Sequence, residues 1–336
     1  MSQRNGWAWC AAAAVLFGAA TPATKLVVDN IGAVTLAGLL YLGAAVAVAP
    51  FAVREPRSAT LVRQRLRLLI AVSLGGGLAP VLLVLALNRT PAGTVSLLLN
   101  LELVATAVIA RVFLQEHLGR RAGIGIVIVL AGGVVLAGTT AAGGATGAIL
   151  VAATCVCWGI DNAITASLDS YGPAQITFAK GLVAGSVNLV IGLILDGKPA
   201  IHYVVAALAV GALGYGLSIT MWITGARLVG ATRGQVIFAL APFIGAVLAW
   251  PVNGDQLTAK VMIAFSLSLI GVVVVATSHH RHPHRHDGFE HSHPLDVADS
   301  HHHPDLIEVL SGAHHRHLAL SHEHEHLPDI HHRHTH

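Results

Sequence analysis

The sequence predicts an all-α polytopic membrane protein: ten transmembrane helices arranged as two inverted five-helix repeats, followed by a disordered tail. Three observations predict it. Apolar residues make up 54% of the 336 residues and charged residues only 11%, whereas a soluble domain carries about 25% charged residues. Long apolar runs alternate with short polar breaks, and the two halves of the chain align with each other. This composition excludes a soluble enzyme, a secreted disulfide scaffold and a nucleic-acid-binding domain.

The apolar runs are long enough for ten helices, because a helix needs about 20 residues to cross the hydrocarbon core. The first run follows Arg4 and resembles a signal peptide, but it has a counterpart in mid-chain, so we expect it to be retained. Abundant small residues suit close helix packing in lipid. The predicted helices are 7–28, 32–53, 66–87, 92–113, 120–138, 147–168, 173–195, 203–224, 232–252 and 258–277.

Several of these helices contain residues that break regular helix. Pro22 lies in the first, Gly75 to Gly77 and Pro80 lie in the third, and Pro242 lies in the ninth. Lipid tolerates such breaks only where neighbouring groups or a water-filled cavity satisfy the freed backbone. We therefore expect bends around a pathway. A purely structural role stays open, since proline and glycine are common in membrane helices.

Basic residues predict the orientation. With the N-terminus inside, the outer segments hold only three basic residues, Arg89, Lys198 and Lys260. The inner segments hold eleven: Arg4, Arg54, Arg57, Arg63, Arg65, Arg67, Arg111, Arg120, Arg121, Arg227 and Arg233. Positive residues concentrate on the cytoplasmic side of membrane proteins. We therefore expect a multi-pass protein of the plasma (bacterial inner) membrane with both termini in the cytoplasm.

An internal repeat divides the chain. A shift of 139 residues aligns the halves and pairs Gly75 with Gly214, Gly77 with Gly216, Glu116 with Asp255, and Gly132 with Gly271. We expect a first repeat over residues 1–140, a second over 147–278 and a tail over 279–336. Each repeat holds five helices, an odd number, so the two insert in opposite orientations. This is the architecture of alternating-access secondary transporters.

Four stretches of the first repeat resemble the EamA domain of the drug/metabolite transporter (DMT) superfamily. They are Ala86 to Ala92, Leu97 to Glu102, Phe113 to Glu116 and Gly123 to Gly133; in the second repeat Trp158-Gly159, Pro242 and Asp255 match the same pattern. The resemblance covers residues from about 10 to 277. It implies a permease that performs ten-helix secondary transport, with a cavity between helices 1–4 and 6–9.

The two repeats depart from that pattern differently. The first has Leu103 where the family favours proline and Phe17 where it favours tryptophan. The basic residue common in the second helix of each repeat is present as Lys180 but is replaced by Tyr41 in the first repeat. The two halves are therefore expected to be chemically unlike.

Polar residues inside the apolar runs predict the substrate cavity. Ionisable groups there cost about 2.5–3.5 kcal/mol each on insertion scales, so they need partners or a wet cavity. Asp161 shares one helix face with Thr154, Cys157 and Thr165, and Lys180 on the next helix is positioned to neutralise it. The open alternatives are a structural ion pair, packing for Trp158 and snorkelling for Lys25. The predicted cavity residues are Asp161, Lys180, Glu102, Thr154, Thr165, Trp158 and Lys25.

The cysteines predict neither a disulfide framework nor a metal site. Cys10, Cys155 and Cys157 all lie inside apolar runs. On one continuous helix the thiols of Cys155 and Cys157 diverge by about 200°. A metal site that uses both is therefore disfavoured.

The tail has a different composition. Residues 1–278 carry a net charge of +8 (16 Lys/Arg against 8 Asp/Glu), whereas residues 279–336 carry −5 (4 Arg against 9 Asp/Glu). Imidazoles favour Zn²⁺, Ni²⁺ and Co²⁺, so the tail is predicted to bind divalent metal. A pH-sensing or solvating tail is the alternative. The predicted metal ligands are His279, His280, His282, His284, His286, His291, His293, His301, His302, His303, His314, His315, His317, His322, His324, His326, His331, His332, His334 and His336.

Three functions remain from the sequence. The favoured one is a permease for a small solute with a metal-binding tail. The second is a divalent metal transporter whose tail collects or senses the metal, and the third is a membrane-anchored metal buffer. Enzyme activity is not expected, because the chain has no phosphate-binding glycine loop and no nucleophile–base pair. We expect the bilayer, a small solute and divalent cations as partners, no nucleic acid and no required cofactor; a homodimer is compatible with the sequence.

Overall fold

The computed structural model describes most of the chain. The described residues are 3–55, 64–113, 119–138, 144–166, 168, 171–229 and 231–277, together with five strands between residues 281 and 325. The chain divides into two units, one of which holds residues 1–278 and the other residues 279–327.

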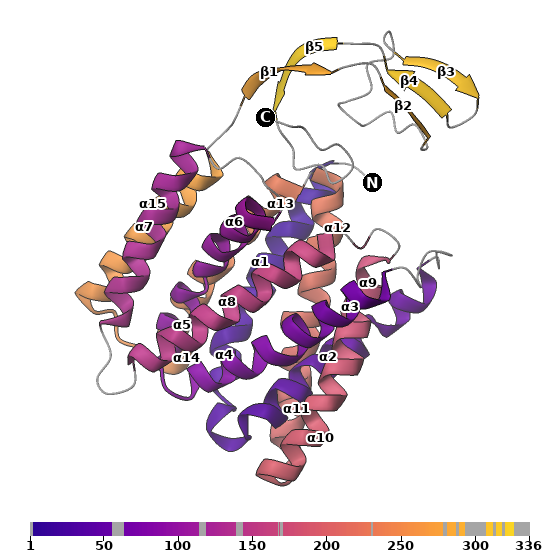
Figure 1. Ribbon diagram of the computed structural model, residues 1–336. Coiled ribbons are helices and arrows are strands. Elements are labelled where there is room, and N and C mark those ends of the chain that lie inside the picture. The colour runs from indigo at the N-terminus through magenta and orange to yellow at the C-terminus, as the bar shows by residue number, and fades with distance from the viewer. Residues whose placement is uncertain are drawn as a thin grey trace. The chain divides into compact units, whose positions relative to one another are not determined.

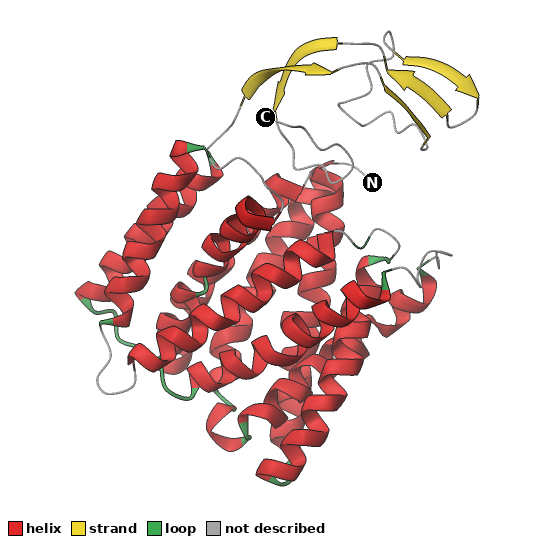
Figure 2. Cartoon of the chain, viewed as in Figure 1, coloured by secondary structure: helices red, strands yellow, loops and turns green. Residues whose placement is uncertain are grey.

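The regular structure described between residues 3 and 277 is entirely helical (Figures 1 and 2). In the first repeat the helices are α1 (Gln3–Lys25), η1 (Val28–Asn30), α2 (Ala33–Arg54), α3 (Arg65–Ala71), η3 (Val72–Leu78), α4 (Ala79–Leu87), α5 (Ala92–Leu98), α6 (Leu101–Phe113) and α7 (Arg120–Ala137). In the second they are α8 (Gly144–Ala166), α9 (Pro173–Ala179), η4 (Lys180–Ala184), α10 (Gly185–Asp196), α11 (Ile201–Val210), η5 (Gly211–Leu217), α12 (Ser218–Val229), α13 (Ala231–Phe238), α14 (Ala241–Asn253) and α15 (Ala259–Ala276).

These helices join end to end into spans. Among the described residues ten spans are long and apolar enough to cross a membrane, which confirms the predicted fold class. We number them in chain order: Asn5–Lys25, Ala33–Arg54, Arg65–Leu87, Ala92–Ile109, Arg120–Ala137, Ala145–Thr165, Pro173–Asp196, Ile201–Ala226, Val236–Asn253 and Ala259–Ala276. The predicted ends fall within a few residues of these bounds at most positions.

Corresponding spans of the two repeats deviate from regular α-helix at corresponding positions. Span 3 contains the π-helical segment η3 (Val72–Leu78), and span 8 contains η5 (Gly211–Leu217), 139 residues later. Span 4 is interrupted at Leu99 and Asn100, and span 9 at Ala239 and Leu240. The residue shift that aligns the sequence therefore also aligns η3 with η5 and brings the two interruptions to within one residue of each other, whereas η4 in span 7 has no counterpart in the α-helical span 2.

Spans 2 and 7 pack together and are joined at both ends. At one end Glu55, which follows α2, accepts hydrogen bonds from the backbone N–H groups of Ala174 (3.1 Å) and Gln175 (2.9 Å) in α9. At the other end Asp196, the last residue of α10, accepts a 3.5 Å hydrogen bond from Thr35 Oγ1 in α2. Each carboxylate lies at the first turn of the opposite helix, where the helix dipole favours negative charge. The two spans are therefore antiparallel and fixed to each other at both ends.

Spans 5 and 10 form a second close pair, α7 against α15 (Figure 1). Gly125 and Gly271 face each other, and a Cβ added to either would lie 2.8 Å from the carbonyl oxygen of the other. No side chain fits in that gap, so glycine at both positions permits the close approach.

The membrane body has one main hydrophobic core, to which spans 2, 3 and 4 each contribute more buried residues than any other span. Its largest fully buried side chains include Leu36, Leu40, Leu83, Leu87 and Leu97. Burying a leucine side chain stabilises the fold by about 1.5–3 kcal/mol relative to an exposed one in water. Large apolar side chains on the outside of the bundle, such as Val46, Val134 and Ile194, are 72–78% exposed and form the surface expected to meet lipid.

The second unit contains five short strands. The strands are β1 (Arg281–His286), β2 (Phe289–Ser292), β3 (Ile307–Ser311), β4 (His314–His317) and β5 (Leu320–Glu325). β1 pairs with β5, and β4 lies between β2 and β3; all pairs are antiparallel. The register sets Arg281 opposite Glu325 and Arg316 opposite both Glu290 and Glu308.

Candidate functional site

A buried ion pair joins spans 6 and 7. Lys180 Nζ lies 2.7 Å from the carboxylate of Asp161, which is near the end of α8. Asp161 is 6% exposed and Lys180 is 8% exposed. Lys180 is the first residue of the π-helical segment η4, so its side chain projects from an irregular turn of span 7. The predicted neutralisation of Asp161 by Lys180 is confirmed.

Thr165 completes this group one helical turn after Asp161. Its hydroxyl donates to Asp161 Oδ1 at 3.2 Å and accepts from Lys180 Nζ at 3.0 Å. Taking two charges out of water costs several kcal/mol per ion unless the partners also satisfy each other's hydrogen bonds. The group of Asp161, Thr165 and Lys180, which we call the polar triad, meets that requirement within two adjacent spans.

The π-helical segment of span 3 packs directly against the polar triad. A Cβ added to Gly75 would overlap the carboxylate of Asp161, so only glycine fits at this position. The Gly75 carbonyl oxygen accepts a hydrogen bond from Tyr41 Oη at 2.7 Å and a second from Trp158 Nε1 at 3.2 Å. Tyr41 belongs to the first repeat and Trp158 to the second. Gly75 is therefore a point at which both repeats and the polar triad meet.

Aromatic rings from several spans gather beside this point. Phe17 in span 1 is the centre, with ring centroids 5.9 Å from Trp158, 5.9 Å from Tyr215 and 5.1 Å from Phe238. Tyr41 contacts Tyr215 at 5.6 Å. We call these five residues the aromatic cluster. Tilted and edge-on ring pairs at such distances stabilise by about 0.5–1.5 kcal/mol beyond the area they bury.

A second carboxylate lies on the other side of span 6. Glu102, in the first turn of α6, accepts a 2.7 Å hydrogen bond from Asn162 Nδ2. Asn162 directly follows Asp161, so span 6 carries polar contacts in two directions: toward span 7 through Asp161 and toward span 4 through Asn162. Glu102 and Asn162 are both partly buried.

The remaining predicted cavity residues are not part of the polar triad. Thr154 is buried and donates to the carbonyl oxygens of Leu150 (2.9 Å) and Ala79 (3.4 Å). Lys25 ends span 1, and its Nζ donates to the carbonyl oxygen of Leu87 at the end of span 3, at 2.6 Å. The structure therefore gathers Asp161, Lys180, Thr165 and Trp158 around Gly75 and leaves Lys25 at one end of the bundle.

Potential metal ligands do not cluster in the membrane body as far as it is described. No group of three or more His, Cys, Asp or Glu side chains suited to a metal is found among the described residues. All three cysteines are free and buried. Glu116 and eleven of the predicted tail ligands lie outside the described residues. The other nine lie on the tail strands, where the backbone alone is described: His282, His284, His286, His291, His314, His315, His317, His322 and His324.

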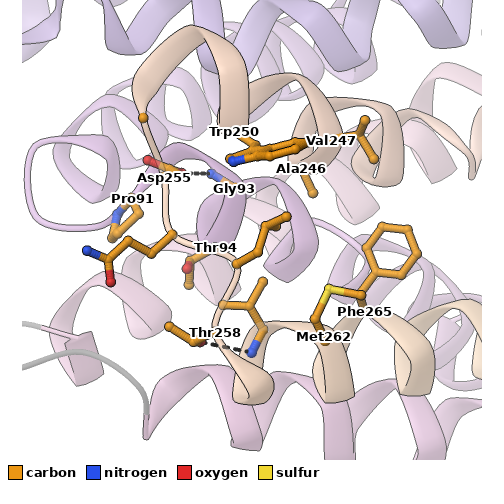
Figure 3. Close-up of a pocket in the computed structure, with 14 residues that line it drawn as sticks. Pro91, Gly93, Thr94, Ala246, Val247, Trp250, Asp255, Thr258, Met262 and Phe265 are labelled. Atoms are coloured by element: carbon orange, nitrogen blue, oxygen red, sulfur yellow. Dashed lines mark hydrogen bonds between the residues drawn. The ribbon is translucent and has the colours of Figure 1, made fainter.

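A pocket of about 540 Å³ lies away from the polar triad, between α5, α14 and α15 (Figure 3). Most of its lining is apolar, with Trp250, Met262 and Phe265 prominent. Its carboxylate, Asp255, accepts a 2.6 Å hydrogen bond from the backbone N–H of Gly93 and so caps α5. The polar triad therefore remains the candidate site, because it holds the buried charges.

Three contacts of the site are absent from the sequence prediction. Tyr41 and Asn188 donate to carbonyls of η3, Asn188 to Gly77 at 3.0 Å, and Asn162 donates to Glu102. For Tyr41 a signal existed, because it aligns with Lys180 in the repeat. For Asn162 and Asn188 the signal was a polar amide inside an apolar span. A search for charged residues alone misses such amides.

Comparison with known proteins also finds the two repeats. The model of the EamA-like transporter family matches twice, over residues 4–138 and 145–277. An uncharacterised transporter of Methanothermobacter thermautotrophicus is 25% identical over 290 residues, which cover 78% of this chain and 83% of the relative. A protein of known crystal structure has a TM-score of 0.57 at 17% identity, over 81% of this chain and 94% of that chain; it shows a shared fold.

Proposed function

Because the chain belongs to the EamA-like transporter family and is a multi-pass membrane transporter of that type, we propose that it moves a small solute by secondary-active, alternating-access transport past the polar triad. The observation that carries this proposal is the buried contact of Lys180 with Asp161 at 2.7 Å, against a π-helical segment that admits no side chain at Gly75.

The fold supports alternating access through its paired irregularities. Inverted repeats transport by rocking one part against another around a site near the middle of the bilayer. Such motion needs places where helices bend, and mid-helix π turns often mark them. Here η3 and η5 occupy corresponding positions of spans 3 and 8. Spans 2 and 7, fixed to each other at both ends, are the natural reference against which the other spans move.

The polar triad supports a role in solute binding. A buried ion pair is weak support for stability, because uncharged side chains of the same volume often stabilise as well or better. Ionisable residues inside a membrane therefore indicate a pathway by default. We propose that Asp161, Lys180 and Thr165 exchange contacts with the polar group of the solute or with a coupling proton, while Trp158 and Tyr41 hold the neighbouring Gly75 carbonyl.

The distribution of basic residues supports a location in the plasma membrane. We propose that both segments flanking the ten spans face the cytoplasm, since eleven of fourteen counted basic residues then lie on that side. In this orientation Glu55 joins spans 2 and 7 near the cytoplasmic face, and Asp196 joins them near the outer face.

The transport proposal is tested with proteoliposomes loaded with a deproteinised extract of the host cell. Mass spectrometry compares which solutes leave vesicles that carry the wild-type chain, the Asp161→Asn variant or no protein. We expect at least one small solute to leave wild-type vesicles at least tenfold faster than Asp161→Asn vesicles. Release profiles that do not differ between wild-type and empty vesicles refute transport of any solute in the extract. Equal release by wild type and variant refutes the role of Asp161.

A second proposal concerns the tail, because residues 279–336 hold 20 of the 22 histidines. We propose that the tail binds divalent metal (Zn²⁺, Ni²⁺ or Co²⁺) and regulates or accompanies transport; the weaker alternative is that the metal is the cargo. Cells that express the full chain are compared with cells that express a chain ending at Ser278. Tail binding predicts several Zn²⁺ per full chain by elemental analysis of the purified protein and none for the shorter one. Equal cellular Zn, Ni and Co in both cell lines and in cells without the chain refutes the cargo alternative.

A further inference from the structure

The pocket between α5, α14 and α15 lies apart from the polar triad and is bordered by side chains of the lipid-facing surface (Figure 3). Its wall on α5 is formed by Gly93 and Thr94, which are buried. Its rim is formed by Val247 and Trp250 of α14 and Met262 of α15, which are 50–57% exposed. Because these exposed side chains belong to the surface expected to meet lipid, a ligand reaches the pocket from the bilayer.

The pocket is apolar along about two turns of α15. Its lining residues on this helix follow one another at steps of three or four residues and so share one face: Thr258, Val261, Met262 and Phe265. From Thr258 to Phe265 the helix rises about 10 Å. Phe265 contacts the buried Phe243 of α14, with ring centroids 5.1 Å apart, and so joins the two helices at this end of the pocket. The volume of about 540 Å³ lies within the roughly 300–1,000 Å³ of ordinary ligand pockets.

Polar groups gather at the other end of the pocket, in the segment that joins spans 9 and 10. Asp255 is partly exposed; its Oδ2 accepts a 2.6 Å hydrogen bond from the Gly93 N–H, and its Oδ1 has no hydrogen-bond partner among the described residues. Gln256 and Thr258 add an amide and a hydroxyl, both of which are donors. Trp250 lies near the end of α14, and tryptophan is enriched at the membrane–water interface. This end of the pocket therefore lies at the depth of the lipid headgroups.

The charge at this end favours one kind of headgroup. Of the described residues that line the pocket, Asp255 alone is charged. A carboxylate attracts the primary ammonium of an ethanolamine headgroup and accepts charge-assisted hydrogen bonds from it. A choline headgroup has the same charge but no N–H donor, and a glycerol headgroup leaves the phosphate charge uncompensated beside the carboxylate. A lipid phosphate next to the ammonium finds donors in Gln256 and Thr258.

We propose that this pocket binds one phospholipid with an ethanolamine headgroup from the bilayer. Its ammonium binds Asp255, its phosphate accepts hydrogen bonds from Gln256 and Thr258, and part of one acyl chain lies along α15 as far as Phe265. The lipid is bound and not transported, so the site is separate from the polar triad. The bound lipid holds the start of span 4 against spans 9 and 10.

The test measures lipid binding to the full chain, separately from transport. The chain is purified in detergent, freed of lipid and mixed with one of three phospholipids that share their acyl chains but carry ethanolamine, choline or glycerol headgroups. Native mass spectrometry counts the lipids retained per chain. Met262→Trp fills the pocket from its rim, and Ile263→Trp is its control, since Ile263 is 53% exposed and does not line the pocket. Asp255→Asn removes the charge but keeps an acceptor for Gly93, and Asp29→Asn, at an exposed position, is its control.

We expect one ethanolamine lipid per chain, bound at least fivefold tighter than either other lipid. Met262→Trp should weaken this binding at least tenfold, and Ile263→Trp should leave it unchanged. Asp255→Asn should reduce it to the level of the choline lipid, and Asp29→Asn should not. Equal binding of the three lipids to the wild-type chain, or equal effects of Met262→Trp and Ile263→Trp, overturns the proposal. A dimer that retains no lipid and is dissociated by Met262→Trp also overturns it, because a second copy of the chain then covers the pocket.

A photoactivatable ethanolamine lipid keeps the test independent of how the variants fold. It carries a diazirine in one acyl chain and is activated while retained on the delipidated wild-type chain. Labelled peptides should come from spans 4, 9 and 10. Labelling confined to other spans overturns the proposal.

Discussion

Replacing Lys180 by methionine leaves a buried carboxylate without its cation, and the structure gives the size of the effect. At 2.7 Å the attraction between the two charges is about 6 kcal/mol at an effective dielectric constant of about 20. Desolvation of the two ions costs a comparable amount. The pair therefore contributes little net stability, but removing one partner exposes the full penalty of the other, about 3–5 kcal/mol.

A double-mutant cycle separates these terms. We expect Lys180→Met and Asp161→Asn each to lower the free energy of unfolding by about 3–5 kcal/mol. The variant with both changes should be more stable than either single variant, within about 2 kcal/mol of wild type. Stability is measured by equilibrium unfolding in mixed lipid–SDS micelles. Lys198→Met and Asp29→Asn, at exposed positions, should each change stability by less than about 0.5 kcal/mol. Additive losses in the double variant would refute a coupled ion pair.

Two further changes test the surroundings of the site. Gly75→Ala places a Cβ on the Asp161 carboxylate, so it should lower the thermal unfolding midpoint. Gly123→Ala is the control, because a Cβ there meets nothing within 4 Å and should leave the midpoint unchanged or raise it. Equal midpoints for the two variants would contradict the packing argument. Glu55→Ala removes two hydrogen bonds at the first turn of α9. It should lower the free energy of unfolding, measured in lipid–SDS micelles, by about 0.5–2 kcal/mol, and Asp29→Ala should not. An unchanged free energy of unfolding for Glu55→Ala would contradict the joining of spans 2 and 7 at this end.

The number of spans and their approximate bounds were predictable because hydropathy and length are local properties of the chain. The glycines of span 3 predicted a break there, and the shift that pairs Gly75 with Gly214 also pairs the two π-helical segments that the structure contains, η3 and η5. The contact of Asp161 with Lys180 was predictable because the apolar surroundings leave each charge few partners. It is confirmed at 2.7 Å.

Other features depend on geometry that hydropathy does not contain. The glycines of span 3 predict a bend, but a π-helical turn keeps the segment apolar. Hydropathy therefore does not reveal η3 itself or the Gly75 carbonyl that accepts hydrogen bonds from Tyr41 and Trp158. Glu102, which contacts Asn162, lies in the first turn after the interruption of span 4 at Leu99 and Asn100. The interruption ends three residues before Leu103, which stands where the family favours proline. In span 9 the corresponding break precedes Pro242, so the second repeat was the better guide to it.

The tail adds a further feature that composition does not contain. Its composition favours disorder, since residues 279–336 are rich in histidine and acidic residues. The strand pairing depends instead on register, for example Arg281 opposite Glu325. Composition averages over such positions, so it cannot indicate the register.

The two oppositely inserted repeats are tested most directly by labelling the ends of spans 2 and 7. Single cysteines replace Arg54, at the end of α2, and Lys198, just after α10; both positions are exposed, and the native cysteines are buried. A membrane-impermeant maleimide is applied to intact cells and to inverted membrane vesicles. Opposite insertion predicts that Arg54→Cys reacts only in inverted vesicles and Lys198→Cys only in intact cells. Reaction of both positions from the same side would contradict the inverted repeat and, with it, the proposed mechanism.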